Sequence, residues 1–296
     1  MKQLFSDSYA RIGLIIWLLL LLLAALGPVI MESVFHQDPA RIDYDALGTP
    51  PSPTHVLGTT PDGQDVFAQF VFGARGSVIV GLGVGLLTVL IALVIGVVGA
   101  YLGGPVDALL NGVTNVALTL AGFPLLLIIV AYVPNAGVAG IIIVISVVSW
   151  PGYARAIRAQ TMSLRGRDFV AASRMAGELP VRVILSEVIP HLLPILAAQF
   201  VGATITGVFS EAGLAFLGIN TGSTVSWGTM ISDVQAQGGL TRGMWWWFIP
   251  PGLGIAILGT ASGLINFGVD AVANPRLRDV RTSRAERKLV RKGLGA

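Results

Sequence analysis

Few residues in this chain have the types and spacing that catalysis requires. Its three lysines are Lys2, Lys288 and Lys292, and none follows the glycine of a G-x-x-x-x-G-K-[ST] phosphate loop. The sequence contains neither a G-x-S-x-G nucleophile elbow nor an H-E-x-x-H zinc motif. We therefore expect no catalytic residue, no metal site and no cofactor bound by this chain itself.

Two polar side chains stand out within apolar stretches. Glu211 is the one acid in its stretch, and Asn115 lies beside Asn111 and Thr114 in another. If these stretches cross a membrane, such residues are functional candidates, and we assign Glu211 and Asn115 to a candidate substrate path. The alternative is structural, because polar side chains also bond neighbouring membrane helices to one another.

A polar, arginine-rich segment, residues 155–190, interrupts the apolar chain. We expect residues 155–164 to continue a preceding helix, and Asp168 to cap a second helix that Gly177 ends. Pro180 is suited to the first turn of a third helix. The segment carries six arginines and a run of small residues: Ala171, Ala172, Ser173 and Ala176.

The arginine-rich segment has two interpretations. Small residues offer a smooth surface that another protein can approach closely, while the arginines pair with acids on that protein. Alternatively, the segment is a hairpin that lies on lipid headgroups.

Composition places these residues in a membrane protein. Hydrophobic residues make up 54% of the 296, charged residues only 12%, and the mean hydropathy is +0.77. A soluble domain of this size needs more charge on its surface. Stretches without charge cover residues 12–31, 76–106, 108–154, 188–210 and 243–269. A span needs about 20 residues, and Pro134 to Gly137 divide the third stretch, so we predict an all-α protein with six transmembrane helices.

Positive charge predicts the orientation. With six spans and a cytoplasmic N-terminus, only Arg41, Arg75 and Arg242 of the 19 lysines and arginines fall outside the cytoplasm. Positive residues in short loops are retained on the cytoplasmic side. We therefore place both termini and the arginine-rich segment in the cytoplasm. An odd number of spans would put either that segment or the basic tail on the wrong side.

We expect one transmembrane domain over residues 1–296. It comprises a first span at 12–31, an outer loop at 32–75, a core at 76–277 and a basic cytoplasmic tail at 278–296. The outer loop is expected to contain a short helix that starts after Asp65. Residues 12–31 form an uncleaved anchor in this interpretation, because their apolar run exceeds that of a cleavable signal peptide, the alternative.

The arginine-rich segment resembles the signature loop of ABC importer permeases, E-A-A, three residues, G, nine residues, I-x-L-P. Residues 171–173, Gly177 and residues 189–190 fall in register, whereas Ala171 replaces the glutamate and Glu187 stands where isoleucine is usual. The stretch SWPGYARAIRAQTMSLRGRDFVAASRMAG resembles the C-type permeases of dipeptide and oligopeptide importers.

Further motifs extend the resemblance over much of the chain. HVLGTTPDGQDV at 55–66 resembles H-P-L-G-T-D-x-x-G-R-D-V, and FGARGS at 72–77 resembles Y-G-A-R-x-S. EAGLAFLG at 211–218, SWG at 226–228 and NPRL at 274–277 resemble the closing signatures. The matches follow in order along the chain, so we identify it as resembling this subfamily.

The resemblance implies a type I ABC importer permease fold and a subunit that is not an enzyme. It implies a multi-pass protein of the bacterial cytoplasmic (inner) membrane that forms half of a pathway for dipeptides or oligopeptides. Its expected partners are the lipid bilayer, a second permease in a heterodimer, an extracytoplasmic substrate-binding protein and two cytoplasmic ATPases that bind ATP and Mg. Nucleic acid is not expected as a partner. By carry-over, the coupling helix seated on an ATPase contains Phe169, Ala171, Ala172, Met175, Ala176, Gly177 and Glu178.

Two alternatives stay open on the sequence. The same architecture also imports nickel chelates, glutathione and glycosides in this subfamily. A secondary transporter would likewise have six or more helices, but it should show broken helices in corresponding halves and ionisable residues at mid-membrane. The spans of this chain are nearly free of charge.

Overall fold

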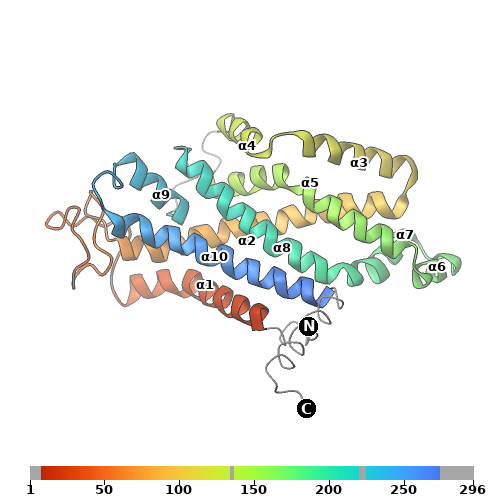
Figure 1. Cartoon of the computed structure of the whole chain (residues 1–296), viewed down its shortest axis with the longest axis horizontal. Helices are drawn as coiled ribbons and strands as arrows, with labels where there is room; N and C mark the ends of the chain where they lie inside the picture. The colour runs from red at the N-terminus through yellow and green to blue at the C-terminus, as the bar shows by residue number, and fades with distance from the viewer. Residues whose placement is uncertain (1–7, 134–136, 220–224, 274–296) are drawn as a thin grey trace, which may run out of the picture.

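The computed structural model describes residues 8–133, 137–219 and 225–273, whose long helices lie roughly along one axis (Figure 1). Several sequence predictions fall outside these residues. They are the position of Lys2, the turn at 134–136, the NPRL motif at 274–277 and the cytoplasmic tail at 278–296.

Five described helices are long and apolar enough to cross a membrane. They are α1 (Ser8–Ser33), α2 (Val66–Leu102), α5 (Gly137–Arg165), α8 (Ile189–Phe216), which continues a helical run from Pro180, and α10 (Trp245–Ala273). A sixth crossing results if α3 (Gly104–Thr119) and α4 (Gly122–Ala131) count as one bent span. The prediction of an all-α membrane protein is confirmed, and β structure in the described residues is limited to two isolated bridges.

The third predicted span is not a straight helix. α3 and α4 meet at an angle of 87°, with Leu120 and Ala121 in extended conformations between them. Pro124 explains the break, because it has no N–H to donate to the carbonyl of Leu120, as an uninterrupted helix would require. Pro124 is well accommodated in the first turn of a new helix, which is where α4 places it.

The outer loop is shorter than residues 32–75. α2 begins at Val66, so residues 66–75 are the first turns of a membrane helix and not a separate short helix. The Asp65 side chain accepts a hydrogen bond from the N–H of Ala68 at 2.8 Å and starts the helix there. The residues that follow Asp65 are largely apolar, so the helix continues directly into the predicted second span.

The arginine-rich segment forms the end of α5, then α6 (Asp168–Met175), α7 (Pro180–Val183) and a π-helical stretch, η2 (Ile184–Val188). Asp168 is the first residue of α6, and Arg167 occupies the cap position without a capping side-chain bond. The third helix is not separate, because α7, η2 and α8 are continuous. Pro190 has no N–H for the usual bond, and the wider π turn before it absorbs the mismatch.

Small residues bring the long helices close together. A Cβ at Gly96 of α2 would lie 2.8 Å from the carbonyl oxygen of Ala154 in α5. On the other side of the bundle, a Cβ at Gly13 of α1 would lie 2.6 Å from the carbonyl oxygen of Ala261 in α10. Such approaches are typical of membrane helices, which pack through small side chains.

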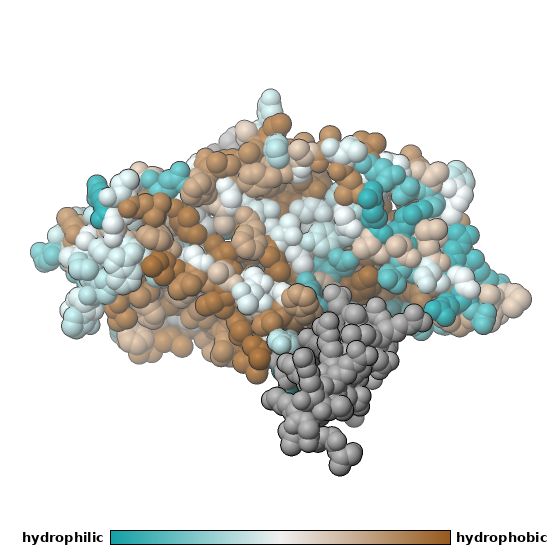
Figure 2. All heavy atoms as spheres, in the orientation of Figure 1, coloured by the Kyte–Doolittle hydropathy of each residue, from teal (hydrophilic) through white to brown (hydrophobic). Residues whose placement is uncertain are grey.

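The two ends of the bundle carry different elements. α1 begins, and α10 ends, toward the end that carries α6 and α7 (Figure 1). The opposite end carries α9 (Trp227–Ala236) and a loop of residues 34–65, which we call the cap. On the face shown in Figure 2, hydrophobic residues cover the middle of the molecule and hydrophilic residues gather at its two ends. This distribution is that of a protein with a lipid-facing middle.

Candidate functional site

The first candidate site is the hairpin of α6 and α7 at one end of the bundle (Figure 1). We call residues 168–183, which contain the predicted ATPase-contact residues, the docking segment. Gly177 has a φ of 79° and ends α6, as the sequence predicts. No atom lies within 4 Å of the position of a Cβ at Gly177, so the turn itself is open. A positive φ favours glycine at this position.

Buried valines fasten the docking segment to the bundle. Val170 and Val183 are fully buried, and they belong to an apolar cluster that also contains Ile157 of α5 and Leu192 of α8. The ring of Phe169 stacks on that of His191, with centroids 4.7 Å apart and an angle of 20° between the planes. The segment is therefore a packed extension of the membrane helices.

Five of the six arginines in the arginine-rich segment bond within the chain. Arg158 donates two hydrogen bonds of 2.8 Å to the Asp107 carboxylate. The other contacts are Arg155 to Asn115 at 2.9 Å, Arg165 to the Ala100 carbonyl at 3.2 Å, Arg174 to the Tyr101 hydroxyl at 3.2 Å and Arg182 to Glu178 at 2.9 Å. Four of these contacts join separate helices, whereas the contact of Arg182 with Glu178 lies within the docking segment.

The surface that the docking segment presents contains large apolar side chains beside the exposed charged residues Asp168, Arg174 and Arg182. Met175 is 84% exposed, Leu179 74% and Val181 67%. Five of the predicted docking residues are exposed: Ala171, Ala172, Met175, Ala176 and Gly177. Phe169 is half-buried and stacks on the exposed His191, and Glu178 is half-buried beside Arg182. Sequence reasoning missed Leu179 and Val181, although apolar residues next to a glycine turn were a visible signal.

The structure does not bring the two candidate substrate-path residues together. Asn115 of α3 accepts a hydrogen bond from Arg155 of α5. Glu211 lies near the cap end, in the last turns of α8. The two side chains thus contact different elements of this chain, α5 for Asn115 and the start of α9 for Glu211.

Glu211 is bound at the start of α9. Its side chain is 1% exposed, and its Oε1 accepts a 2.6 Å hydrogen bond from the hydroxyl of Ser226, the N-cap of α9. A Cβ at Gly228 would lie 2.6 Å from Oε2, so the carboxylate sits against the first turn. A helix N-terminus stabilises negative charge. This geometry favours the structural alternative for Glu211.

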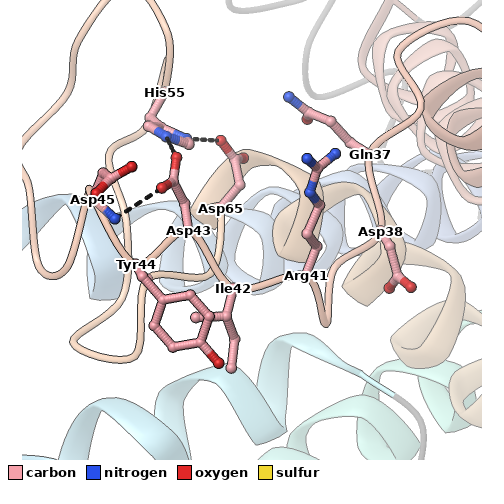
Figure 3. A pocket seen from close by; sticks show the side chains of 10 residues that line it. Gln37, Asp38, Arg41, Ile42, Asp43, Tyr44, Asp45, His55 and Asp65 are labelled. Atoms are coloured by element: carbon pink, nitrogen blue, oxygen red, sulfur yellow. Dashed lines mark hydrogen bonds and ion pairs between the residues drawn. The ribbon is translucent and has the colours of Figure 1, made fainter.

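The cap is organised around one histidine (Figure 3). His55 Nδ1 lies 2.8 Å from Asp65 Oδ2, and Nε2 lies 3.4 Å from Asp43 Oδ2. Together with Arg41 and Tyr44, these residues line a cavity of about 320 Å³. Within the described ranges, no group of three or more histidine, cysteine, aspartate or glutamate side chains is arranged to hold a metal ion. The charged and polar side chains around this cavity thus form a polar site at the end of the bundle, outside the hydrophobic middle.

Comparison with known proteins covers nearly the whole chain. Residues 66–279 match the family described as "binding-protein-dependent transport system inner membrane component". The dipeptide transport system permease protein DppC of Bacillus subtilis is 30% identical over 281 residues, which are 94% of this chain and 85% of that protein. The oligopeptide transport system permease protein OppC of the same organism is 28% identical over 92% of this chain and 87% of its own length. A putative peptide transport system permease protein of Brucella abortus is 31% identical, with coverage of 94% and 91%.

Proposed function

Because the chain belongs to the family of binding-protein-dependent transport system inner membrane components, we propose that it forms half of the membrane pathway of an ATP-driven peptide importer. The family match confirms the resemblance that the sequence motifs indicated. The helical bundle, with its hydrophobic middle, agrees with a multi-pass membrane subunit.

The peptide cargo rests on the relatives. The three proteins named above are described as dipeptide, oligopeptide and peptide permeases, and each aligns with more than nine-tenths of this chain. In this proposal the protein lies in the bacterial cytoplasmic membrane, pairs with a different permease and catalyses no reaction itself. ATP and Mg are bound by two cytoplasmic ATPases, and a binding protein delivers the peptide at the cap. Nickel chelates, glutathione or glycosides are the alternative cargoes.

The shape of the docking segment supports its assignment to the ATPases. Met175, Leu179 and Val181 form an exposed apolar surface beyond the end of the membrane helices. Large apolar side chains exposed at a polar end of a membrane protein are typical of a surface that another protein covers. The buried valines beneath them fix the surface in place, so that a partner meets a preformed shape.

The central test is a charge placed on this surface. Met175→Asp should reduce co-purification of the ATPases with the permease pair by about tenfold or more, because the complex would bury an unpaired carboxylate. Leu102→Asp is the matched control. Leu102 is a 48% exposed apolar residue at the end of α2, outside the docking segment. It should leave co-purification unchanged.

A second variant protects the test against misfolding. Gly177→Asp changes the open turn, where a side chain meets a positive φ but no neighbouring atom. Normal ATPase binding and normal ATP hydrolysis in both Met175→Asp and Gly177→Asp would refute the docking assignment. Transport by the permease pair in vesicles without ATPases would favour a secondary transporter instead.

Glu211 and Asn115 require a separate test. We propose that Glu211→Gln lowers the stability of the permease and leaves its apparent affinity for peptide unchanged, since the carboxylate is bound at the start of α9. A changed affinity with an unchanged melting temperature would return Glu211 to the substrate path. Asn115→Ala distinguishes the same two roles for Asn115, whose amide oxygen accepts a hydrogen bond from Arg155.

A further inference from the structure

Helix α2 runs without a break from the cap to the docking segment. Its 37 residues contain no proline, and at 1.5 Å per residue they span about 55 Å. In Figure 1, one end of α2 lies beside the cap and the other lies toward α6 and α7. An unbroken, hydrogen-bonded helix moves largely as one body, so a displacement at one end reaches the other.

The outer end of α2 is bound to the cap and to α9. Asp65 caps α2 through Oδ1 and contacts His55 through Oδ2. One turn further on, the indole N–H of Trp227 in α9 donates to the carbonyl oxygen of Phe70 at 3.0 Å. Next, Ser77 Oγ accepts a 3.0 Å hydrogen bond from the backbone N–H of Trp227. The cap and the outer end of α2 therefore form one connected unit.

The inner end of α2 is held by two arginines of the arginine-rich segment. The guanidinium carbon of Arg174 lies 4.4 Å from the ring centroid of Tyr101, and its Nε lies 3.2 Å from the hydroxyl. Arg165 donates a hydrogen bond to the carbonyl of Ala100. A Cβ at Gly103 would lie 2.5 Å from Nη1 of Arg165. Both arginines place positive charge at the C-terminus of α2, where the helix dipole favours it.

Side chains alone make this connection. α5 leads into α6 through two residues of chain, and α7 leads into α8, so both neighbours are joined to the docking segment covalently. α2 is distant in sequence and meets α6 through Arg174 and Tyr101. Tyr101 is 4% exposed, and it belongs to the same apolar cluster as Val170 of α6. A substitution can therefore weaken the connection without interrupting the chain.

We propose that α2 carries movement between the docking segment and the cap, and that Arg174 and Tyr101 are the positioning residues that join α6 to it. This inference rests on the proposed function, because it requires ATPases at the docking segment. We expect movement to be transmitted in both directions. Nucleotide binding by the ATPases displaces the cap, and binding at the cap shifts the equilibrium between the states of the ATPases.

The absence of cysteine permits a direct measurement of cap movement. The chain has no cysteine, so a single thiol introduced as Tyr44→Cys, at a cap position 79% exposed, can be labelled selectively in the purified chain with an environment-sensitive fluorophore before the complex is assembled. The complete complex of both permeases and both ATPases is reconstituted in vesicles. ATP with Mg is then added on the ATPase side, and the change in emission is recorded.

The expected result separates transmission from docking. Tyr101→Leu, outside the docking segment, should reduce the amplitude of the emission change about five- to tenfold while the ATPases remain bound and hydrolyse ATP. Arg174→Gln changes the docking segment itself, so its amplitude is measured per bound ATPase and should fall by a similar factor. Tyr101→Phe should retain more than half of the amplitude, because the ring that faces the guanidinium remains. Leu102→Ala, the exposed neighbour of Tyr101, is the matched control and should retain all of it.

Three outcomes would overturn the inference. The first is full amplitude in both Arg174→Gln and Tyr101→Leu with ATPases bound. The second is loss of ATPase binding in Arg174→Gln, which would assign the contact to docking. Should Tyr101→Leu fail to assemble, the amplitude per bound ATPase in Arg174→Gln decides, because Arg174 lies outside the buried cluster and its replacement leaves that cluster intact. The third is an unsubstituted complex that binds no ATPase, which refutes the proposed function as well and is thereby distinguished from the first two.

Discussion

The ion pair between Asp107 and Arg158 should be the strongest single polar contact in the half of the bundle that carries the docking segment. It joins α3 to α5 through two hydrogen bonds of 2.8 Å, and its side chains are only 21% and 26% exposed. Removing one partner of a fully buried pair costs about 3–5 kcal/mol, whereas an exposed pair contributes about 0.2–1 kcal/mol. At this intermediate burial we expect each single variant, Asp107→Asn or Arg158→Gln, to lose about 2 kcal/mol.

A double-mutant cycle measures the contribution of the pair itself. Thermal unfolding in detergent, followed through tryptophan fluorescence, should show each single variant melting roughly 4–8 °C below the parent. The double variant should lose less than the sum of the single losses, with a coupling energy of about 1.5 kcal/mol. The pair of Arg182 and Glu178, 73% and 30% exposed, is the matched control and should give below about 0.5 kcal/mol.

The size of the coupling energy decides the argument. Hydrogen bonds between membrane helices average about 0.6 kcal/mol in such cycles. A value at or below that figure for Asp107 and Arg158 would refute the reasoning, because the two charges would then add nothing to an ordinary interhelical hydrogen bond.

Three further outcomes are expected. His55→Gln should speed tryptic cleavage within the cap several-fold, since one imidazole contacts two of its aspartates, and an unchanged rate would contradict this. Partial loss of hydration raises the pKa of Asp233. Ionisation of this carboxyl group therefore destabilises the fold as the pH rises from about 3.8 through the raised pKa. Asp233→Asn should accordingly raise the melting temperature at pH 7 and not at pH 3. Gly254→Ala should cost about 1–3 kcal/mol, because its Cβ would lie 2.8 Å from the Trp227 ring, whereas Gly252→Ala, with open space around it, should be tolerated.

Local signals in the sequence located several of the helix boundaries. Asp65 caps α2, Gly177 ends α6 and Pro180 opens α7, as predicted, because each depends on the backbone preferences of one residue or on a bond within one turn. The prediction was less accurate where one signal competed with another. The predicted outer loop extended to residue 75, ten residues too far, because the helix capped by Asp65 continues directly into the span.

The bent third span shows a different limit. An apolar stretch of sufficient length predicted one crossing, yet α3 and α4 meet at 87° near Pro124. Hydropathy is averaged over a window of residues. It therefore shows that a stretch is apolar, but not that one residue in it is a proline, which has no N–H to donate. Proline at position 124 was visible in the sequence, and its effect on the third span was missed.

The sequence alone determined what kind of protein this is. Charge-free stretches of membrane length, arginines gathered on one side and motifs in order predict a helical permease, because each is a property of residues near one another in the chain. Only the tertiary structure decided what the polar side chains do. Arg158 meets an acceptor 51 residues away and Arg174 one 73 residues away, while Glu211 meets a helix N-terminus. Such partners become neighbours only when the helices pack, which no local pattern specifies.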